Sequence, residues 1–398
     1  MNKYIRRTMG TCMLCLMLAV PGRGLKGQSI VSEQKITAIF ELEKKYLDNA
    51  WDTVKSNGRL PRSTQRGYQP ITDWTAGFYP GSLWLTYEYT KDKELLKKAA
   101  YATSLLEADK DFSHDHDIGF IMYCSYGNGY RLTQNPAYRD ILIHSSKTAL
   151  KRYSSKVKSI MSWNPNQKRN WKFPVIIDNM MNLEMLLETH RWTGDSSFYK
   201  VAVNHANTTM KNQYRKDYSC SHVVDYDPAT GVMRKRDWNN GDSDPATAAW
   251  SRGQSWGLYG FTFMYKYTRK KEYLMQAENI AAYILNNPHM PEDMVPYWDY
   301  TGAKKSTMRD ASAAALLASG LLALSSLSEA HGKTYFTAAE KILVSLASPR
   351  YLNETGKGIF LLKHATGNYL QQSELDAGLI YADYYFLEAL LRYRELRK

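Results

Sequence analysis

The amino-acid sequence predicts an all-α protein, a single-domain (α/α)6 barrel with six inner and six outer helices. Long segments after residue 30 carry apolar residues at helical spacing, and the alternation typical of strands is nearly absent. Two kinds of helix take turns along the chain. One kind is amphipathic, and the other is apolar on nearly every side, so it must be enclosed by protein. Six such alternations predict two concentric rings.

Each outer helix is followed by its inner partner. The outer helices, most of them bearing lysine, are expected at 32–51, 94–108, 138–153, 196–213, 271–287 and 335–347. The inner helices, rich in glycine, alanine and aromatic residues, are expected at 77–90, 117–130, 178–194, 248–268, 310–327 and 375–393. If the inner helices share one direction, their N-termini open on one concave rim, the default place for a site. The residues there are Trp74, Asp117, Asp178, Arg252, Asp310 and Asp376.

Residues 1–27 are predicted to be a signal peptide, and residues 28–398 the barrel domain. A basic start, a short apolar run and small residues near Gly27 are typical of such a leader. The apolar run is too short for a membrane span, so we expect export to a periplasm. Two cysteines remain after it, Cys124 and Cys220, which either form a disulfide or stay buried thiols.

The net charge of +13 falls to +8 once the five basic residues of the leader are set aside. The chain has neither a long basic run nor a nucleic-acid motif, so no nucleic-acid partner is expected. A mild positive excess fits an anionic small molecule or glycan. The chain contains 30 Tyr and 10 Trp, and such rings suit sugars, although most pack in protein cores.

The stretch "SHDHDIGF", residues 113–120, resembles a metal site at first sight. However, consecutive residues at a helix start point in different directions, and neither H-E-x-x-H nor paired cysteines are present. The sequence also lacks a nucleophile elbow, a phosphate-binding glycine loop and a dinucleotide fingerprint. We therefore expect no metal and no cofactor.

Aspartates at helix starts often serve only as caps, because the carboxylate accepts bonds from exposed backbone N–H groups. We interpret Asp310 and Asp376 in this way. Asp117 and Asp178 differ, because each opens an enclosed helix beside aromatic and amide residues such as Asn179. Two carboxylates facing each other across an enclosed rim would push one pKa upward, which suits acid/base chemistry.

Two further segments contribute candidates to this rim. His222 lies in the long loop 220–247, which should end there. In "AWSRGQSWGLYGF", Arg252 could clamp a carboxylate, or it could be a buried arginine paired with a structural aspartate. Trp250 and Trp256 in the same segment could stack on a sugar.

Five ordered motifs carry a family resemblance. They are "DWTAGFYPGSLW" (73–84), "HDIGF" (116–120), "IIDNMMNLEMLL" (176–187), "AWSRGQSWGLYGF" (249–261) and "DYYFLEAL" (383–390). Together they resemble the unsaturated glucuronyl hydrolases of glycoside hydrolase family 88. The unsaturated rhamnogalacturonyl hydrolases, which act on pectin fragments, share the barrel and are the nearest alternative. A non-catalytic glycan-binding barrel is a second alternative, which would not need Asp117 and Asp178 together.

The resemblance implies hydrolysis of oligosaccharides that polysaccharide lyases release, which carry a 4,5-unsaturated uronic acid at the non-reducing end. Asp178 would protonate C4 of the double bond, and water would then add at C5. Asp117 would be the second essential carboxylate. By the same resemblance His222 and Arg252 contact the substrate, and Trp74 is an aromatic platform. The remaining candidates for substrate binding are Asn179, Trp250, Trp256 and Lys363.

One position departs from the family pattern. Family members often have a glutamine about ten residues before the arginine of the "RGQ" motif, and Asp242 stands there. The stretch 361–373, with Lys363, His364 and Ser373, precedes the last inner helix and could accommodate a sulfated aminosugar. We therefore expect glycosaminoglycan disaccharides as substrates of a monomeric or dimeric enzyme, with the preferred sulfation left open.

Overall fold

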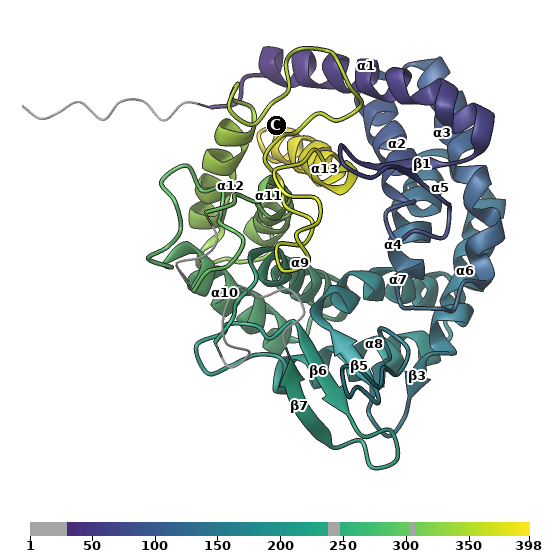
Figure 1. The fold of residues 1–398 in the computed structure, drawn as a ribbon, viewed down its shortest axis with the longest axis vertical. Coiled ribbons are helices and arrows are strands. Elements are labelled where there is room, and N and C mark those ends of the chain that lie inside the picture. The colour runs from purple at the N-terminus through teal and green to yellow at the C-terminus, as the bar shows by residue number, and fades with distance from the viewer. Residues whose placement is uncertain (1–29, 238–246, 302–306) are drawn as a thin grey trace, which may run out of the picture.

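A computed structural model of the chain describes residues 30–237, 247–301 and 307–398. Figure 1 shows the helices arranged in two rings around a common centre. The outer ring contains α1 (Glu33–Asn57), α3 (Lys93–Ser104), α6 (Pro136–Leu150), α8 (Ser196–Asn212), α10 (Lys271–Leu285) and α12 (Gly332–Leu346). The inner ring contains α2 (Phe78–Thr90), α4 (Ile118–Met122), α5 (Asn128–Thr133), α7 (Leu183–Thr193), α9 (Ser251–Thr268), α11 (Ala311–Ser325) and α13 (Ile380–Leu396).

The burial of the helices follows the predicted alternation. On the outer helix α10 the buried positions recur every three or four residues: Tyr273, Gln276, Ala277, Ile280, Ala281 and Ile284. On the inner helix α9 every residue from Ser251 to Met264 is buried. An inner helix packs against its neighbours on both sides and against its outer partner, so no face is left for water. The prediction of an (α/α)6 barrel is confirmed.

Three inner helices differ by several residues from the expected ranges. The second one is interrupted, because a π-helical turn at Tyr123–Gly127 joins α4 to α5. The third one, α7, begins at Leu183 rather than at residue 178, because residues 177–182 form a 3-10 helix. The last one begins at Ile380 rather than at residue 375. Asp376 therefore does not cap it. Asp376 instead has a left-handed φ of 48°, and its carboxylate lies 2.5 Å from Nδ1 of His364 in the preceding loop.

Short strands, which the sequence pattern did not predict, shape the rim. A hairpin of β1 (Leu60–Ser63) and β2 (Gly67–Gln69) precedes α2, and β3 (Tyr153–Ser154) pairs with β4 (Ser159–Ile160). The antiparallel sheet β5–β6–β7 contains Pro174–Ile176, Val223–Tyr226 and Met233–Asp237. β5 leads directly into a 3-10 helix, Ile177–Asn182, which precedes α7.

Two other sequence expectations have structural outcomes within the described residues. Cys124 and Cys220 are buried free thiols and do not form a disulfide. No helix in this part of the chain is long and apolar enough to cross a membrane. The expected signal peptide, residues 1–27, and Asp242 lie outside the described residues.

Candidate active site

A cavity of about 240 Å³ lies at the N-terminal ends of the inner helices. Its wall includes six residues that the sequence placed on this rim or in its loops, namely Trp74, Asp117, Asp178, His222, Trp250 and Arg252. These residues come from segments spread over most of the barrel, and the shared direction of the inner helices brings them together.

Asp178 reaches this cavity from the 3-10 helix that follows β5. Strand pairing places it beside His222, because Ile176 is opposite Val223 and the N–H of Ile177 donates to the His222 carbonyl at 3.1 Å. Oδ2 of Asp178 lies 3.8 Å from Nε2 of His222 and has no hydrogen-bond partner among the described residues. Burial raises the pKa of Asp178 to about 7, although the charge of Arg252 opposes this shift. The site thus holds a carboxyl group that is protonated near neutrality.

Asp117 is the residue just before α4, but its carboxylate does not cap the helix. Instead, its own backbone N–H donates to Oδ1 of Asp115 at 2.8 Å. The pKa of Asp117 is raised well above its ordinary value, mainly by burial and then by the nearby charges of Asp115 and Asp178. The charge of Asp178 thus contributes to the raised pKa of Asp117, the other carboxyl group predicted from the sequence.

The four polar residues of "HDHD" are directed to different partners. His114 Nδ1 lies 3.1 Å from the amide nitrogen of Asn164, whereas His116 is buried with Nδ1 3.3 Å from the amide nitrogen of Asn182. Burial lowers the pKa of His116 to about 3, so this imidazole stays neutral beside Asp117. The arrangement orients the Asp117 carboxyl group, and the four side chains do not converge on one point.

Asn182 and Gly119 hold the two carboxylate-bearing segments together. The side-chain oxygen of Asn182, from the 3-10 helix, accepts the backbone N–H of Phe120 on α4 at 2.9 Å. A Cβ on Gly119 would lie only 2.3 Å from that oxygen and 2.7 Å from the Asn182 Cα. One close contact thus requires both Gly119 of "HDIGF" and Asn182 of "DNMMN". This contact sets Asp117 near Asp178.

His222 lies within a column of stacked rings. Its centroid is 4.7 Å from that of Trp250 and 6.0 Å from that of Trp163, and Trp163 stacks in turn on Trp171 at 5.5 Å. Burial, followed by the charge of Arg252, lowers the pKa of His222 to about 3. Neither ring nitrogen has a hydrogen-bond partner in the described part of the chain. A neutral, oriented imidazole therefore borders the cavity and can bond to a ligand.

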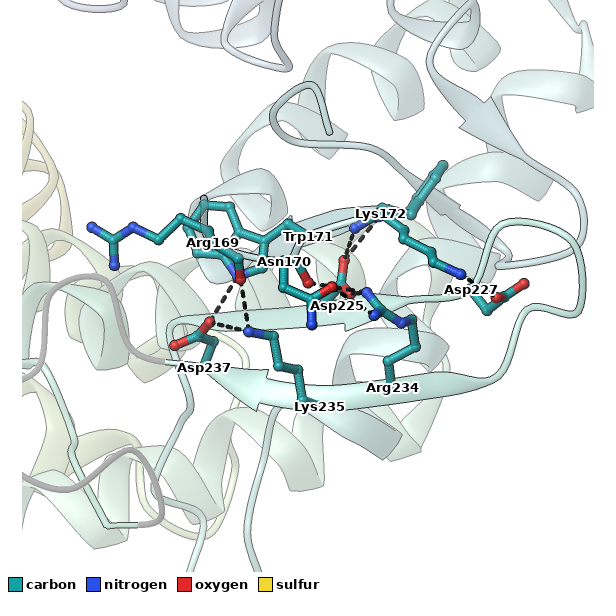
Figure 2. A network of polar contacts seen from close by, with 10 residues as sticks. Arg169, Asn170, Trp171, Lys172, Asp225, Asp227, Arg234, Lys235 and Asp237 are labelled. Atoms are coloured by element: carbon teal, nitrogen blue, oxygen red, sulfur yellow. Dashed lines mark hydrogen bonds and ion pairs between the residues drawn. The ribbon is translucent and has the colours of Figure 1, made fainter. Parts of the chain in front are cut away.

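The loop 161–173 carries two rings of this column, Trp163 and Trp171, and a polar network fixes it to the sheet (Figure 2). Asp225 on β6 is fully buried and accepts the backbone N–H groups of Lys172 and Phe173, each at 2.8 Å. It also forms an ion pair with Arg234 on β7. Trp171, the residue before Lys172, donates its Nε1–H to Asp237 on β7 at 2.7 Å. The sheet therefore positions the aromatic wall of the cavity.

Arg252 lines the cavity but is buried and paired within the protein, and its contact with a substrate stays a prediction. Its guanidinium forms an ion pair with Asp310 at 2.5 Å and donates to the carbonyls of Thr366 and Gly367 at 2.6 and 2.7 Å. Asp310 also accepts the backbone N–H groups of Ser312 and Ala313, which confirms its predicted capping role. The second reading of Arg252, pairing with a structural aspartate, is the one observed.

Three predicted substrate-binding residues lie outside the cavity wall. Trp256 is 1% exposed, because it packs edge-on against Phe120 and Tyr385 in the barrel core. Asn179 is buried beneath the rim, where its amide donates to the carbonyl of Ile160 at 3.0 Å. Lys363 donates instead to the Pro349 carbonyl at 2.8 Å. Neighbouring residues of the loop that carries Lys363 do line the cavity, Ser373 among them.

The sequence analysis missed several lining residues, chiefly Arg62, Arg66, Trp163, Ile176, Glu374 and Tyr381. Trp163 and Ile176 belong to the connection 162–176, whose length and position before an inner helix were a usable signal. Arg62 and Arg66 belong to the β1–β2 hairpin, which also precedes an inner helix. Their side-chain directions depend on a strand pairing that short segments do not reveal.

A larger hollow of about 940 Å³ opens at the opposite end of the barrel, along the C-terminal halves of the inner helices. Two of its central carboxylates have partners in the protein. Glu388 accepts from Tyr259 at 3.1 Å and pairs with Arg392 at 3.1 Å, and Glu188 pairs with Arg191 at 2.7 Å. The smaller cavity is the better candidate for chemistry, because there an unbonded carboxyl oxygen lies beside an imidazole whose nitrogens are also unbonded within the described residues.

Comparison with known proteins agrees with this geometry. Residues 44–389 match the sequence profile of Glycosyl Hydrolase Family 88. The chain belongs to this family. The family 88 protein is therefore a glycoside hydrolase, and its candidate active site is the cavity that contains Asp117 and Asp178.

Relatives of this family 88 hydrolase cover nearly the whole barrel. An unsaturated glucuronyl hydrolase of Formosa agariphila is 45% identical over 330 residues, which are 82% of this chain and 81% of the relative. An unsaturated chondroitin disaccharide hydrolase of Streptococcus pyogenes is 31% identical over 376 residues, 92% and 93% of the two chains. The crystal structure of an unsaturated glucuronyl hydrolase specific for heparin has a TM-score of 0.87 and 42% identity, covering 92% of this chain and 98% of that one.

Proposed function

We propose that this family 88 hydrolase removes 4,5-unsaturated uronic acid from the non-reducing end of lyase-generated oligosaccharides, with glycosaminoglycan disaccharides as its substrates. The names of its relatives support this substrate class. The observation that carries the proposal is Asp178, whose Oδ2 borders the cavity without a hydrogen-bond partner among the described residues. A raised pKa of about 7 lets this carboxyl group act as an acid near neutrality.

In the first step, protonated Asp178 transfers its proton to C4 of the sugar. The electron pair of the C4=C5 double bond forms the new C–H bond, and the ring oxygen stabilises the positive charge that develops at C5. Aspartate 178 is left as a carboxylate. General acid catalysis by a positioned carboxyl group contributes roughly 10²- to 10⁴-fold to a rate.

In the second step, water adds at C5 and gives its proton to the Asp178 carboxylate, which restores the acid. The product is a hemiketal at C5. It opens to a ketone, and the exposed hemiacetal at C1 then releases the next sugar. By the family resemblance Asp117 is the second essential carboxyl group in this scheme, and the charge of Asp178 contributes to its raised pKa. Neutral His222 and the ring of Trp74 border the same space and would hold the sugar.

The loss of ultraviolet absorbance of the unsaturated uronate tests this function. The purified enzyme is mixed with lyase-derived disaccharides of chondroitin, hyaluronan, heparin and pectin type, with and without sulfate. Decay of absorbance on the glycosaminoglycan members supports the proposal. Decay on the pectin member alone would favour a rhamnogalacturonyl hydrolase, and binding without decay would indicate a glycan-binding barrel.

We also propose that residues 1–27 are a cleaved signal peptide and that the mature enzyme, residues 28–398, is exported to a periplasm as a monomer or dimer. The support is the basic, apolar and small-residue pattern of this leader. Mass spectrometry of the protein recovered from the periplasmic fraction tests it. A mature N-terminus near residue 28 is expected, and an intact leader on cytoplasmic protein would contradict it.

A further inference from the structure

An unsaturated uronate carries a negative charge, so a cavity that binds it should offer a cation with free donors. Three arginines line this cavity, Arg62, Arg66 and Arg252. Their hydrogen bonds show which of them has donors to spare.

Arg62 is engaged on both sides of its guanidinium. Nε and Nη2 donate to the two carboxylate oxygens of Glu374 at 2.9 and 2.8 Å, and Nη1 donates to Asp73 at 2.7 Å. Only 11% of its side chain is exposed. This bidentate pair joins the β1–β2 hairpin to the loop before α13, so Arg62 braces the rim.

Arg252 is engaged more completely. Nη1 donates to Asp310, to Ser312 and to the Thr366 carbonyl, and Nη2 donates to the Gly367 carbonyl. The guanidinium lies 4.6 Å from the centroid of the Trp250 ring. Only Nε has no partner within the described residues, and it is buried. One buried donor does not make the planar, bidentate contact that a carboxylate or sulfate favours.

Arg66 differs from both. It stands at the turn of the β1–β2 hairpin, where its backbone N–H donates to Oγ of Ser63 at 3.0 Å and Gly67 adopts a φ of 60°. Its side chain is exposed and borders the cavity. In the described part of the chain its guanidinium has no ion pair and no hydrogen bond, so all of its donors are available.

We propose that Arg66 binds an anionic oxygen group of the substrate, either the carboxylate of the unsaturated uronate or a sulfate on the disaccharide. This rests on the proposed function. Arg66 stands at the exposed edge of the cavity, and the hydrogen bond from its backbone N–H to Ser63 holds its backbone in the turn. Because it does not contact the reacting double bond in this scheme, its loss should weaken binding and leave the chemistry intact.

The variants Arg66→Gln and Arg66→Lys test this inference, with Arg59→Gln as the matched control. Arg59 precedes the same hairpin and donates to the Tyr68 carbonyl, but it does not line the cavity. The substrates are an unsulfated unsaturated chondroitin disaccharide and its 6-sulfated counterpart. For Arg66→Gln we expect KM to rise about tenfold with kcat nearly unchanged, the size of effect typical of a lost charge-assisted bond. The KM of Arg66→Lys should lie between those of the parent enzyme and Arg66→Gln. The KM of the control Arg59→Gln should match that of the parent enzyme.

The two substrates identify the group that is bound. An equal rise in KM on both assigns Arg66 to the uronate carboxylate, and a rise on the sulfated disaccharide alone assigns it to the sulfate. Unchanged KM on both, with an active parent enzyme, would overturn the inference while the proposed function stands. A parent enzyme inactive on every unsaturated disaccharide would instead overturn the proposed function.

Discussion

Asp310 caps the inner helix α11 and Asp178 lies in the 3-10 helix before α7, and their carboxylates meet different partners. Asp310 accepts the N–H groups of Ser312 and Ala313 and pairs with Arg252, so its oxygens are used within the protein. Asp178 has an oxygen without a partner among the described residues, at the cavity wall. The difference arises from the neighbours. Arg252 and the first backbone N–H groups of α11 bind Asp310, whereas the residue beside Asp178 is His222, which lies 3.8 Å away and carries no charge. One residue type thus has a structural role in one place and is available for chemistry in the other.

The pH dependence of the rate should follow the protonation of Asp178. Burial raises its pKa to about 7, so the acid form dominates below that pH and is lost above it. We expect kcat/KM to fall about tenfold per pH unit above about pH 7. Initial rates on one unsaturated disaccharide between about pH 5 and 9 measure this. A rate that climbs from pH 7 to 9 would contradict the role of Asp178 as the acid.

At the scale of elements, the sequence pattern predicts long helices well and short strands poorly. Six inner and six outer segments were recognisable because each spans several turns of consistent apolar spacing. The strands contain two to five residues, too few for alternation to be distinguished. The start of the last inner helix was misplaced, because Asp376 resembles a cap but bonds to His364 instead. Arg66 lies in the β1–β2 turn and Trp163 in the loop between β4 and β5, so these two parts of the site were missed.

The contact between Gly119 on α4 and Asn182 of the 3-10 helix should not tolerate an added methyl group on Gly119. In Gly119→Ala the new Cβ would meet backbone and side-chain atoms of Asn182 at 2.3 to 2.7 Å, so one segment must move. We expect a loss of about 1–3 kcal/mol in the free energy of unfolding and a marked fall in kcat, because Asp117 shifts relative to Asp178. Thermal unfolding and the absorbance assay measure both effects. A variant with unchanged stability and rate would show that this contact does not position the carboxyl groups.

We expect Asp225 to hold the sheet β5–β6–β7 and the loop before β5 together. In Asp225→Asn the ion pair with Arg234 is lost and one of the acceptors in a buried site becomes a donor. We expect unfolding in urea to show a loss of about 1–3 kcal/mol. Asp227→Asn, one residue beyond β6, is the matched control. Its pair with Lys172 is more exposed, so its loss should cost less than about 1 kcal/mol. Equal effects of the two variants would disprove the anchoring role of Asp225.

At the scale of the whole molecule, the barrel gathers distant segments at one end. The N-termini of the inner helices share a rim, so Trp74, Asp117, Asp178 and Arg252 could be placed together from the alternation of helices alone. The alternation could not predict which polar side chains are already paired within the protein. Arg252 has partners that come from loops far along the chain, as the pair with Asp310 and the bond to Thr366 illustrate. Such partners follow from packing and not from local pattern.

The most direct test of the central claim is the reaction run in D₂O with an unsaturated disaccharide and followed by nuclear magnetic resonance. We expect the double bond to disappear as the second sugar is released, with deuterium at C4 of the uronate product. The same experiment on Asp178→Asn should show neither change at a comparable enzyme concentration. Release of the second sugar with the C4=C5 double bond intact would contradict hydration, and full activity of Asp178→Asn would contradict the assignment of the acid.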